Sequence, residues 1–148
     1  MADIPVQFQI ESAIGSNILS TDLNSKASSA TAINLVTTTL DMSAATYLSA
    51  AFELVLGSIT PTAGGYITLC LWSSVDGTNF VDQTLDAVCF QQTRVLLTGA
   101  SAKRCCFAFE NLPPLVYKIG IINASGSSTA SSGNTLAVRK WREKAVTP

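Results

Sequence analysis

The densest group of oxygen-bearing side chains lies in the segment WSSVDGTNFVDQ, residues 72–83. It holds four oxygen ligands within seven residues, namely Asp76, Thr78, Asn79 and Asp82. Such a group could bind Ca²⁺, but the spacing departs from the EF-hand loop, which needs alternating ligands, a glycine at the sixth position and a closing glutamate. Asp76 stands beside a glycine in a sequence typical of a turn, where its carboxylate has a structural use. We therefore predict turn chemistry here and no metal site.

Catalysis by the general base most used near neutral pH is excluded, because the chain contains no histidine. A Ser-His-Asp or Cys-His arrangement is impossible for the same reason. Hydrolysis by two carboxylates stays formally open through Asp76, Asp82 and Asp86, since it needs a pair only about 5 to 9 Å apart. These residues fall in a turn or at strand edges, and the chain has no GxxxxGK phosphate loop. We predict no enzyme activity, no catalytic residue and no cofactor.

The four cysteines are predicted to be reduced packing residues. Cys70 and Cys89 lie in apolar strand patterns, and the adjacent Cys105 and Cys106 must face opposite sides of a strand. None has the CxxC spacing of a zinc or redox site, and no histidine can complete a mixed metal site. Reduced thiols suit a protein made in a cytoplasm.

The segment RKWREK, residues 139–144, is the densest group of charges. Cations interleaved with an aromatic ring can follow a nucleic-acid backbone and stack a base, but the sequence pI of about 5.2 argues against a nucleic-acid partner. One interpretation is a solvated strand end whose tryptophan covers the core, and the other is a tail that docks on an acidic protein surface. The candidate partner contacts in this segment are Arg139, Lys140, Trp141, Arg142 and Lys144.

Two aromatic residues flank the Asp-Gly turn, Trp72 before it and Phe80 after it. Exposed rings on the loops of a β-sandwich are how many carbohydrate-binding modules stack sugars. Strand alternation sets Trp72 opposite the face of Leu69 and Leu71, so it is either exposed or part of a second packed layer. Core packing and surface contact are both open for these two rings.

Short segments with a two-residue alternation of apolar and other residues predict an all-β fold. In the clearest of them Ile67, Leu69 and Leu71 share one face, and the Asp-Gly pair that follows predicts a tight hairpin returning through Phe80 and Val81. The predicted strands are Val6–Ile10, Ala32–Thr38, Ala51–Leu56, Tyr66–Ser73, Ala87–Gln91, Val95–Thr98, Arg104–Glu110, Tyr117–Asn123 and Thr135–Trp141. We predict a β-sandwich, with a jelly roll as a candidate topology and one helical turn within residues 41–50.

We predict a single β-sandwich domain over residues 32–148 with a basic carboxy-terminal tail, preceded by an arm and the first strand in residues 1–31. Residues 11–31 are rich in Ser, Asn, Ala and Thr, which is typical of an extended arm over the sheet or over a neighbour. The apolar residues of the arm are candidate partner contacts, namely Ile14, Ile18, Leu19 and Leu23. Residues 124–133, ASGSSTASSG, predict a flexible surface loop, or a segment that becomes ordered against a partner.

Charge is scarce in this chain and divided along it. Only 13% of residues are charged, against roughly 25% in an average soluble domain, so we expect an oligomer or a component of a larger assembly. Residues 1–93 carry one basic and eight acidic residues, a net charge of −7, and residues 94–148 carry eight basic and two acidic residues, a net charge of +6. Either the halves neutralise each other within the fold, or opposite patches meet between subunits. We predict neither a secretion signal nor a membrane partner, because no basic region precedes an apolar run and no run reaches roughly 20 residues.

The segments LWSSVDGTNFVDQ and ENLPPLVYKIGIINASGSSTASSGNTLAVRKWRE resemble small structural proteins of tailed-bacteriophage virions. In those proteins a hairpin of the type S-x-D-G-x-x-F precedes a strand that follows Leu-Pro and carries a tyrosine, and a loop of small residues comes next. The matching residues are Ser74, Asp76, Gly77, Phe80, Leu112, Pro113, Tyr117 and Ile119. The resemblance implies a β-sandwich subunit of the virion without catalytic residues.

We therefore expect a capsid cement or decoration protein that stabilises the shell by bridging capsid subunits, made in the host cytoplasm and located in the virion. The alternatives are a component of the phage tail, neck or fibre, and a carbohydrate-binding module. The expected partners are the major capsid protein or other virion proteins, together with further copies of the chain. The resemblance implies a trimer, because such proteins commonly sit at local threefold positions of a shell.

Overall fold

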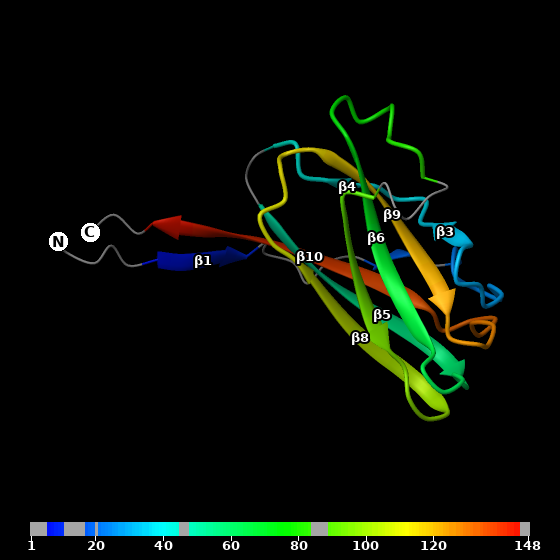
Figure 1. The fold of residues 1–148 in the computed structure, drawn as a ribbon. Helices are drawn as coiled ribbons and strands as arrows, with labels where there is room; N and C mark the ends of the chain where they lie inside the picture. The colour runs from blue at the N-terminus through cyan, green and yellow to red at the C-terminus, as the bar shows by residue number, and fades with distance from the viewer. Residues whose placement is uncertain (1–5, 11–16, 20, 45–47, 84–88, 146–148) are drawn as a thin grey trace.

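The computed structural model describes residues 6–10, 17–19, 21–44, 48–83 and 89–145. Within these ranges the strands form two antiparallel sheets packed face to face, which confirms the predicted all-β sandwich (Figure 1). The strands are β1 (Val6–Ile10), β2 (Asn17–Leu19), β3 (Ile33–Leu35), β4 (Leu40–Asp41), β5 (Ser49–Ile59), β6 (Tyr66–Ser74), β7 (Gln91–Leu96), β8 (Ser101–Phe109), β9 (Val116–Ala124) and β10 (Thr135–Ala145). The described residues contain no helix that is long and apolar enough to cross a membrane.

Eight of the strands pair in a nested order that defines a jelly roll. β1 pairs with β10, β3 with β9, β5 with β8 and β6 with β7, all antiparallel, so the chain resembles one long hairpin whose outermost partners are β1 and β10. Sheet A has the order β1–β10–β5–β8 with β2 beside β10, and sheet B has the order β3–β9–β6–β7 with β4 beside β9. A long hairpin rolled into two sheets is the jelly-roll arrangement, which confirms the candidate topology.

The main core lies between the two sheets. β5 buries Phe52, Leu54 and Leu56, whereas the residues between them are partly exposed, as expected for a strand with one face on the core. The ring of Phe52 packs edge-on against that of Phe109 in β8, with ring centroids 5.8 Å apart. Burial of each large apolar side chain contributes roughly 1.5–3 kcal/mol, so this layer is the main source of stability.

The tight hairpin predicted after β6 is wrong in its returning strand. β6 does pair with β7, but residues 75–90 connect them, and neither Phe80 nor Val81 is in a strand. Within the turn, Asp76 Oδ1 accepts hydrogen bonds from the N–H groups of Thr78 and Asn79 at 2.8 and 2.7 Å. The chain then comes back beside the end of β6, where the N–H of Val81 donates to the carbonyl of Ser73 at 3.4 Å, but the described residues form no further strand before β7.

Three other predicted elements differ from the structure. β7 alone replaces the predicted strands Ala87–Gln91 and Val95–Thr98, of which residues 87 and 88 lie outside the described ranges. Where a helical turn is predicted within residues 41–50, the described residues are the end of β4, a turn at residues 43–44 and the start of β5. In this turn Asp41 accepts bonds from the N–H and hydroxyl of Ser43 at 2.8 and 2.6 Å. An aspartate that bonds two residues ahead favours a turn over a helix.

Residues 124–133 form an anchored loop, so the prediction of a flexible one is wrong. The buried Asn123 directs its Nδ2 to the carbonyls of Lys26 and Ser127, at 3.2 and 2.9 Å. Its Oδ1 accepts bonds from the N–H and hydroxyl of Ser125, which is also fully buried. The hydroxyl of Thr129 donates to the carbonyl of Leu23. Small polar side chains hold this loop by hydrogen bonds in place of large apolar ones.

The segment predicted as an arm belongs to the sandwich from residue 21 onward. Leu23 is fully buried in the main core, so the prediction that it contacts a partner is wrong. The N–H of Lys26 donates to Thr129 Oγ1 at 2.9 Å, and Asn134 Nδ2 donates to Asn24 Oδ1 at 2.8 Å. These bonds fix the segment on the loop of residues 124–133.

Candidate functional site

The structure has a two-stranded ribbon, Val6–Ile10 of β1 paired with Trp141–Ala145 of β10. The stretch beyond Trp141, predicted as a basic tail, is thus the end of a strand. β5 pairs with β10 only as far as Trp141, opposite Ser49, and from residue 142 onward β10 pairs with β1 alone within the described ranges. Figure 1 shows the two strands leaving the sandwich side by side. Two strands alone are only marginally stable in water, so the ribbon calls for further contacts.

The register of the ribbon separates apolar from polar residues. Directly paired residues share a face of a sheet, and neighbours along a strand alternate between faces. One face is mainly apolar and consists of Val6, Phe8, Ile10, Trp141, Glu143 and Ala145. The other face is polar and cationic and consists of Gln7, Gln9, Arg142 and Lys144. The register of the ribbon therefore places mainly apolar residues on one face and cationic residues on the other.

The structure brings most of the predicted contact residues to β10 and its neighbour. Arg139, Lys140, Trp141, Arg142 and Lys144 all lie in β10, and the first four are half-buried. Ile18 and Leu19 lie in β2, which pairs with β10, and Ile14 lies outside the described residues. Lys140 Nζ donates to the carbonyl of Asp41 at 3.4 Å, so this cation has a partner inside the chain.

Trp72 is fully buried, so of the two interpretations left open by the sequence the core one is confirmed and a surface contact is excluded. The ring belongs to a second apolar cluster, on the outer face of sheet B, which comprises Cys70, Trp72 and Ile122 with Ile33 and Cys89 packed against them. Gly120 in β9 makes room for the ring, since a Cβ there would lie 2.4 Å from the Trp72 ring. β6 is thus buried on both faces, and Trp72 is not available to stack a sugar.

Phe80 is half-buried beside a cation. The Nζ of Lys118 lies 5.5 Å from the centroid of the Phe80 ring, within the range of a cation–π contact. The ring thus has an intrachain partner, and its role as a surface contact stays a prediction.

Asp76 is the centre of a hydrogen-bonded turn, as predicted. Besides the two N–H groups, its carboxylate accepts bonds from the side chains of Asn79 and Ser74, each at 2.8 Å. These bonds, above all the one from the Asn79 N–H and then that from Thr78, hold the pKa of Asp76 well below its ordinary value of 3.8. Gly77 adopts a φ of 72°, a left-handed backbone that glycine accepts without strain. The carboxylate is therefore occupied by its own loop.

Replacing Asp76 by alanine is expected to loosen this turn. A group whose pKa is depressed in the fold stabilises it above the ordinary pKa, and that contribution is lost as the pH falls through the depressed value. Amide hydrogen exchange of Thr78 and Asn79 at neutral pH should therefore be faster in the variant, and the difference should shrink below about pH 3.8. Asp41→Ala, which removes a similar turn elsewhere, is the control and should leave both amides unchanged. Equal exchange in Asp76→Ala and the wild type would contradict the assignment.

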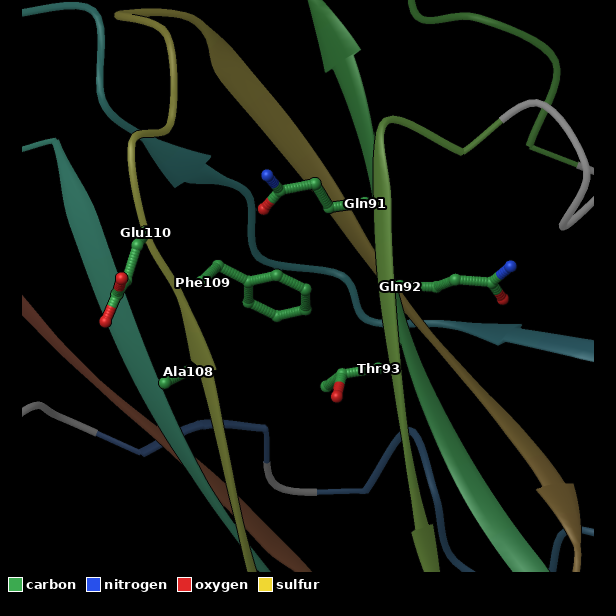
Figure 2. A pocket seen from close by; sticks show the side chains of 6 residues that line it. All are labelled: Gln91, Gln92, Thr93, Ala108, Phe109 and Glu110. Atoms are coloured by element: carbon green, nitrogen blue, oxygen red, sulfur yellow. The ribbon is translucent and has the colours of Figure 1, made fainter.

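A pocket of about 430 Å³ opens between the edge strands β7 and β8. It is lined by Gln91, Gln92 and Thr93 from one side and by Ala108, Phe109 and Glu110 from the other. Figure 2 shows Phe109 and Gln91 pointing into the gap between the strands, whereas Gln92 points away from it. The lining supplies one carboxylate and no second acid or base to pair with it, so it lacks the two-carboxylate arrangement of a hydrolase. The described residues also contain no group of three metal-binding side chains.

A smaller depression of about 180 Å³ lies on the outer face of sheet A. Its lining includes Ala51, Glu53 and Ala137, and the partly exposed Glu53 forms an ion pair with Arg104 at 3.2 Å. Both side chains of the pair are largely in solvent, so the pair adds less than about 1 kcal/mol. Cys106 lines the same depression and is exposed, so the prediction that all four cysteines are packing residues is wrong for this one, although none of the four is in a disulfide.

Comparisons with known proteins give no family for this chain. No protein-family model matches it, and no curated protein sequence matches it. Among solved structures it is similar to the Yersinia pseudotuberculosis-derived mitogen (YPM), with a TM-score of 0.26 and 10% identity over 98% of this chain and 88% of that one. That TM-score is too low to indicate a common fold, so the mitogen carries no argument about function.

Proposed function

We propose that the chain is a structural subunit of a virion, a cement or decoration protein that stabilises a capsid by bridging its subunits. The observation that carries the proposal is the ribbon. Among the described residues the sandwich extends β1 and the end of β10 as a pair of strands that no other strand covers, and such a pair is suited to further contacts with a neighbouring molecule. The low charge of the chain supports the same conclusion.

The fold class agrees with this proposal without deciding it. Jelly rolls occur in viral capsid proteins and also in lectins, so the function has to come from the surface. The lectin-like alternative depended chiefly on Trp72, and the burial of that ring counts against it. A tail, neck or fibre component remains the rival, because it could use the same ribbon in a ring or a spike.

The proposed partners are the major capsid protein, or other virion proteins, and further copies of this chain. The cationic face of the ribbon suits an acidic protein surface, which would direct the orientation of docking more than its strength. The resemblance to phage structural proteins adds a trimer at threefold positions of the shell, with synthesis in the host cytoplasm and residence in the virion. No nucleic acid, cofactor or catalytic step is part of the proposal.

The charge on the ribbon can be tested with particles. Arg142→Glu/Lys144→Glu is expected to reduce binding of the purified protein to particles that lack it, measured by co-sedimentation, by about tenfold or more. Arg94→Glu/Lys103→Glu, which reverses two cations on β7 and β8, is the matched control and should bind as the wild type does. Equal loss in both variants would point to net charge and not to the ribbon.

Electron cryo-microscopy of intact particles tests the location. Density for the sandwich on the shell, with the ribbon against neighbouring capsid subunits, is the expected result. Density confined to the tail would replace the cement assignment by its rival, and particles without this chain would overturn the virion proposal altogether.

A further inference from the structure

The outer edge of β1 differs from the other sheet edges of the molecule. An exposed strand edge is a template for pairing with another chain, and proteins usually protect it with charge or by keeping the strand short. β7 carries Arg94 and β8 carries Lys103 and Arg104, while β2, β3 and β4 have three, three and two residues. β1 has five residues, VQFQI, without charge or proline, and within the described ranges its one partner strand is β10.

The order of residue types in β1 is symmetric about Phe8. Reading outward from Phe8, the next residues are Gln7 and Gln9, and the outer residues are Val6 and Ile10. If two copies of β1 run antiparallel about a twofold axis at Phe8, all five residues pair. Phe8 then meets Phe8 of the second copy, glutamine meets glutamine, and valine meets isoleucine. A slip by one residue would set Phe8 and one of the outer apolar residues opposite glutamines and leave the other outer residue without a partner in β1, so the alternation favours this register.

We infer that β1 pairs edge to edge with β1 of a second copy of this chain, about a twofold axis at Phe8. The contact joins the two A sheets into one sheet that continues through β10, β1 and the β1 and β10 of the second copy. It satisfies the backbone groups of the uncovered edge and places apolar residues opposite apolar residues on one face. Such a contact is isologous, since each copy contributes the same surface.

The β1–β1 contact adds to the proposed function. It shares with that proposal one premise, namely that the ribbon contacts other molecules. A twofold contact cannot by itself close a trimer. On a shell it therefore links two neighbouring oligomers, so that the protein bridges capsid subunits through its own copies as well as through the capsid surface. The purified protein should show the contact in solution, without particles.

A pair of glutamine substitutions separates the inferred contact from the ribbon itself. In the chain's own register Gln7 is paired with Lys144 and Gln9 with Arg142, so Gln7→Glu/Gln9→Glu sets opposite charges together within the ribbon. Across the inferred twofold axis the same change sets like charges opposite each other at two places. We expect the wild type to sediment as a dimer or an even multiple, and the double variant to dissociate with a constant about tenfold higher or more.

The matched control is Gln91→Glu/Gln92→Glu, which adds the same charge to the edge strand β7 and should sediment as the wild type does. Circular dichroism and thermal unfolding verify that each variant is folded. A wild type that stays monomeric at high concentration, or a double variant of β1 as dimeric as the control, would overturn the inference.

Cross-linking tests the register. In a Cys106→Ser background, Phe8→Cys puts one thiol on the axis, where it meets its own copy, and mild oxidation should join the chains. Val6→Cys puts its thiols about 13 Å apart along the strands, beyond the reach of a disulfide. Equal cross-linking of the two variants would rule out this register.

The two proposals fail separately. Dimers in solution together with particles that lack the protein would leave the inference standing and remove the virion function. A monomer that nevertheless binds to shells would do the opposite.

Discussion

Trp72→Ala is expected to lower the free energy of unfolding by about 3–5 kcal/mol, the usual cost of truncating a buried tryptophan. The ring has no exposed surface and holds together the cluster on the outer face of sheet B, which the main core cannot replace because β6 and β9 lie between them. Denaturant unfolding followed by circular dichroism measures the change. A loss below about 1 kcal/mol would mean that the cluster has little part in stability.

Gly120, which packs against the Trp72 ring, allows a more specific test of this contact. Gly120→Ala should lower the free energy of unfolding by about 1–3 kcal/mol, because the added Cβ would overlap the Trp72 ring. In the Trp72→Ala background the same change should cost less, because the close contact that remains for the added Cβ is with Cγ2 of Ile33, 2.9 Å away. The smaller loss in this double-mutant cycle identifies the Gly120–Trp72 contact. Additive effects would contradict it.

Asn123→Ala is expected to lower the free energy of unfolding by about 1–3 kcal/mol. The substitution leaves the N–H of the buried Ser125 without its acceptor, and a buried group left unsatisfied costs about that much. It also removes one of two donors from each of the carbonyls of Lys26 and Ser127, which keep the Thr129 N–H and the Ser125 hydroxyl. Thermal or denaturant unfolding measures the total. Amide exchange should quicken in residues 124–133 and also in residues 23–29, because the network joins them.

Two variants separate the hydrogen bonds from the volume of the side chain. Asn123→Asp keeps the shape but sets a carboxylate against two carbonyl oxygens, so it should destabilise at neutral pH and less in acid, where the protonated carboxyl can donate. Asn34→Ala, at a half-buried asparagine with one long bond of 3.4 Å, is the control and should cost less than about 1 kcal/mol. If Asn123→Asp hardly lowers the free energy of unfolding at neutral pH, the role assigned to the Nδ2 donor is wrong.

The strands of this fold could be predicted because their hydrophobic period is local. The alternation of Ile67, Leu69 and Leu71 is visible in the sequence, and the structure buries all three in the main core. The nested pairing of strands is not local, because the sequence of β1 does not indicate that it pairs with β10. The pattern therefore predicted a sandwich, and the jelly roll could only be a candidate.

The errors have the same physical origin. The loop of residues 124–133 was predicted to be flexible because its anchors lie far away in the sequence, as in the bond between Lys26 and Thr129, which are 103 residues apart. The environment of Trp72 depends on the missing side chain of Gly120, on another strand. Charge at residues 139–144 suggested a tail, but an apolar partner strand keeps that segment extended.

The contact surface was only partly predicted from the sequence. Residues of β10 were among the expected contacts, whereas β1 was predicted as a strand and not as a contact. The available signal was the absence of charge from VQFQI in a chain whose longer edge strands carry arginine or lysine. Leu23 shows the converse error, since an apolar residue in a polar segment was assigned to a partner when it belongs to the chain's own core.

The position of β10 has a consequence for synthesis. β10 is synthesised after the other described strands, yet it is an internal strand of sheet A, between β1 and β5, so β1 cannot pair with it until residues 135–145 have been made. A fold completed by its most distant contacts forms slowly and exposes strand edges in the meantime. A nascent chain interrupted before residue 135 lacks the central strand of sheet A, and loss of this protein during expression should come from aggregation of such incomplete chains.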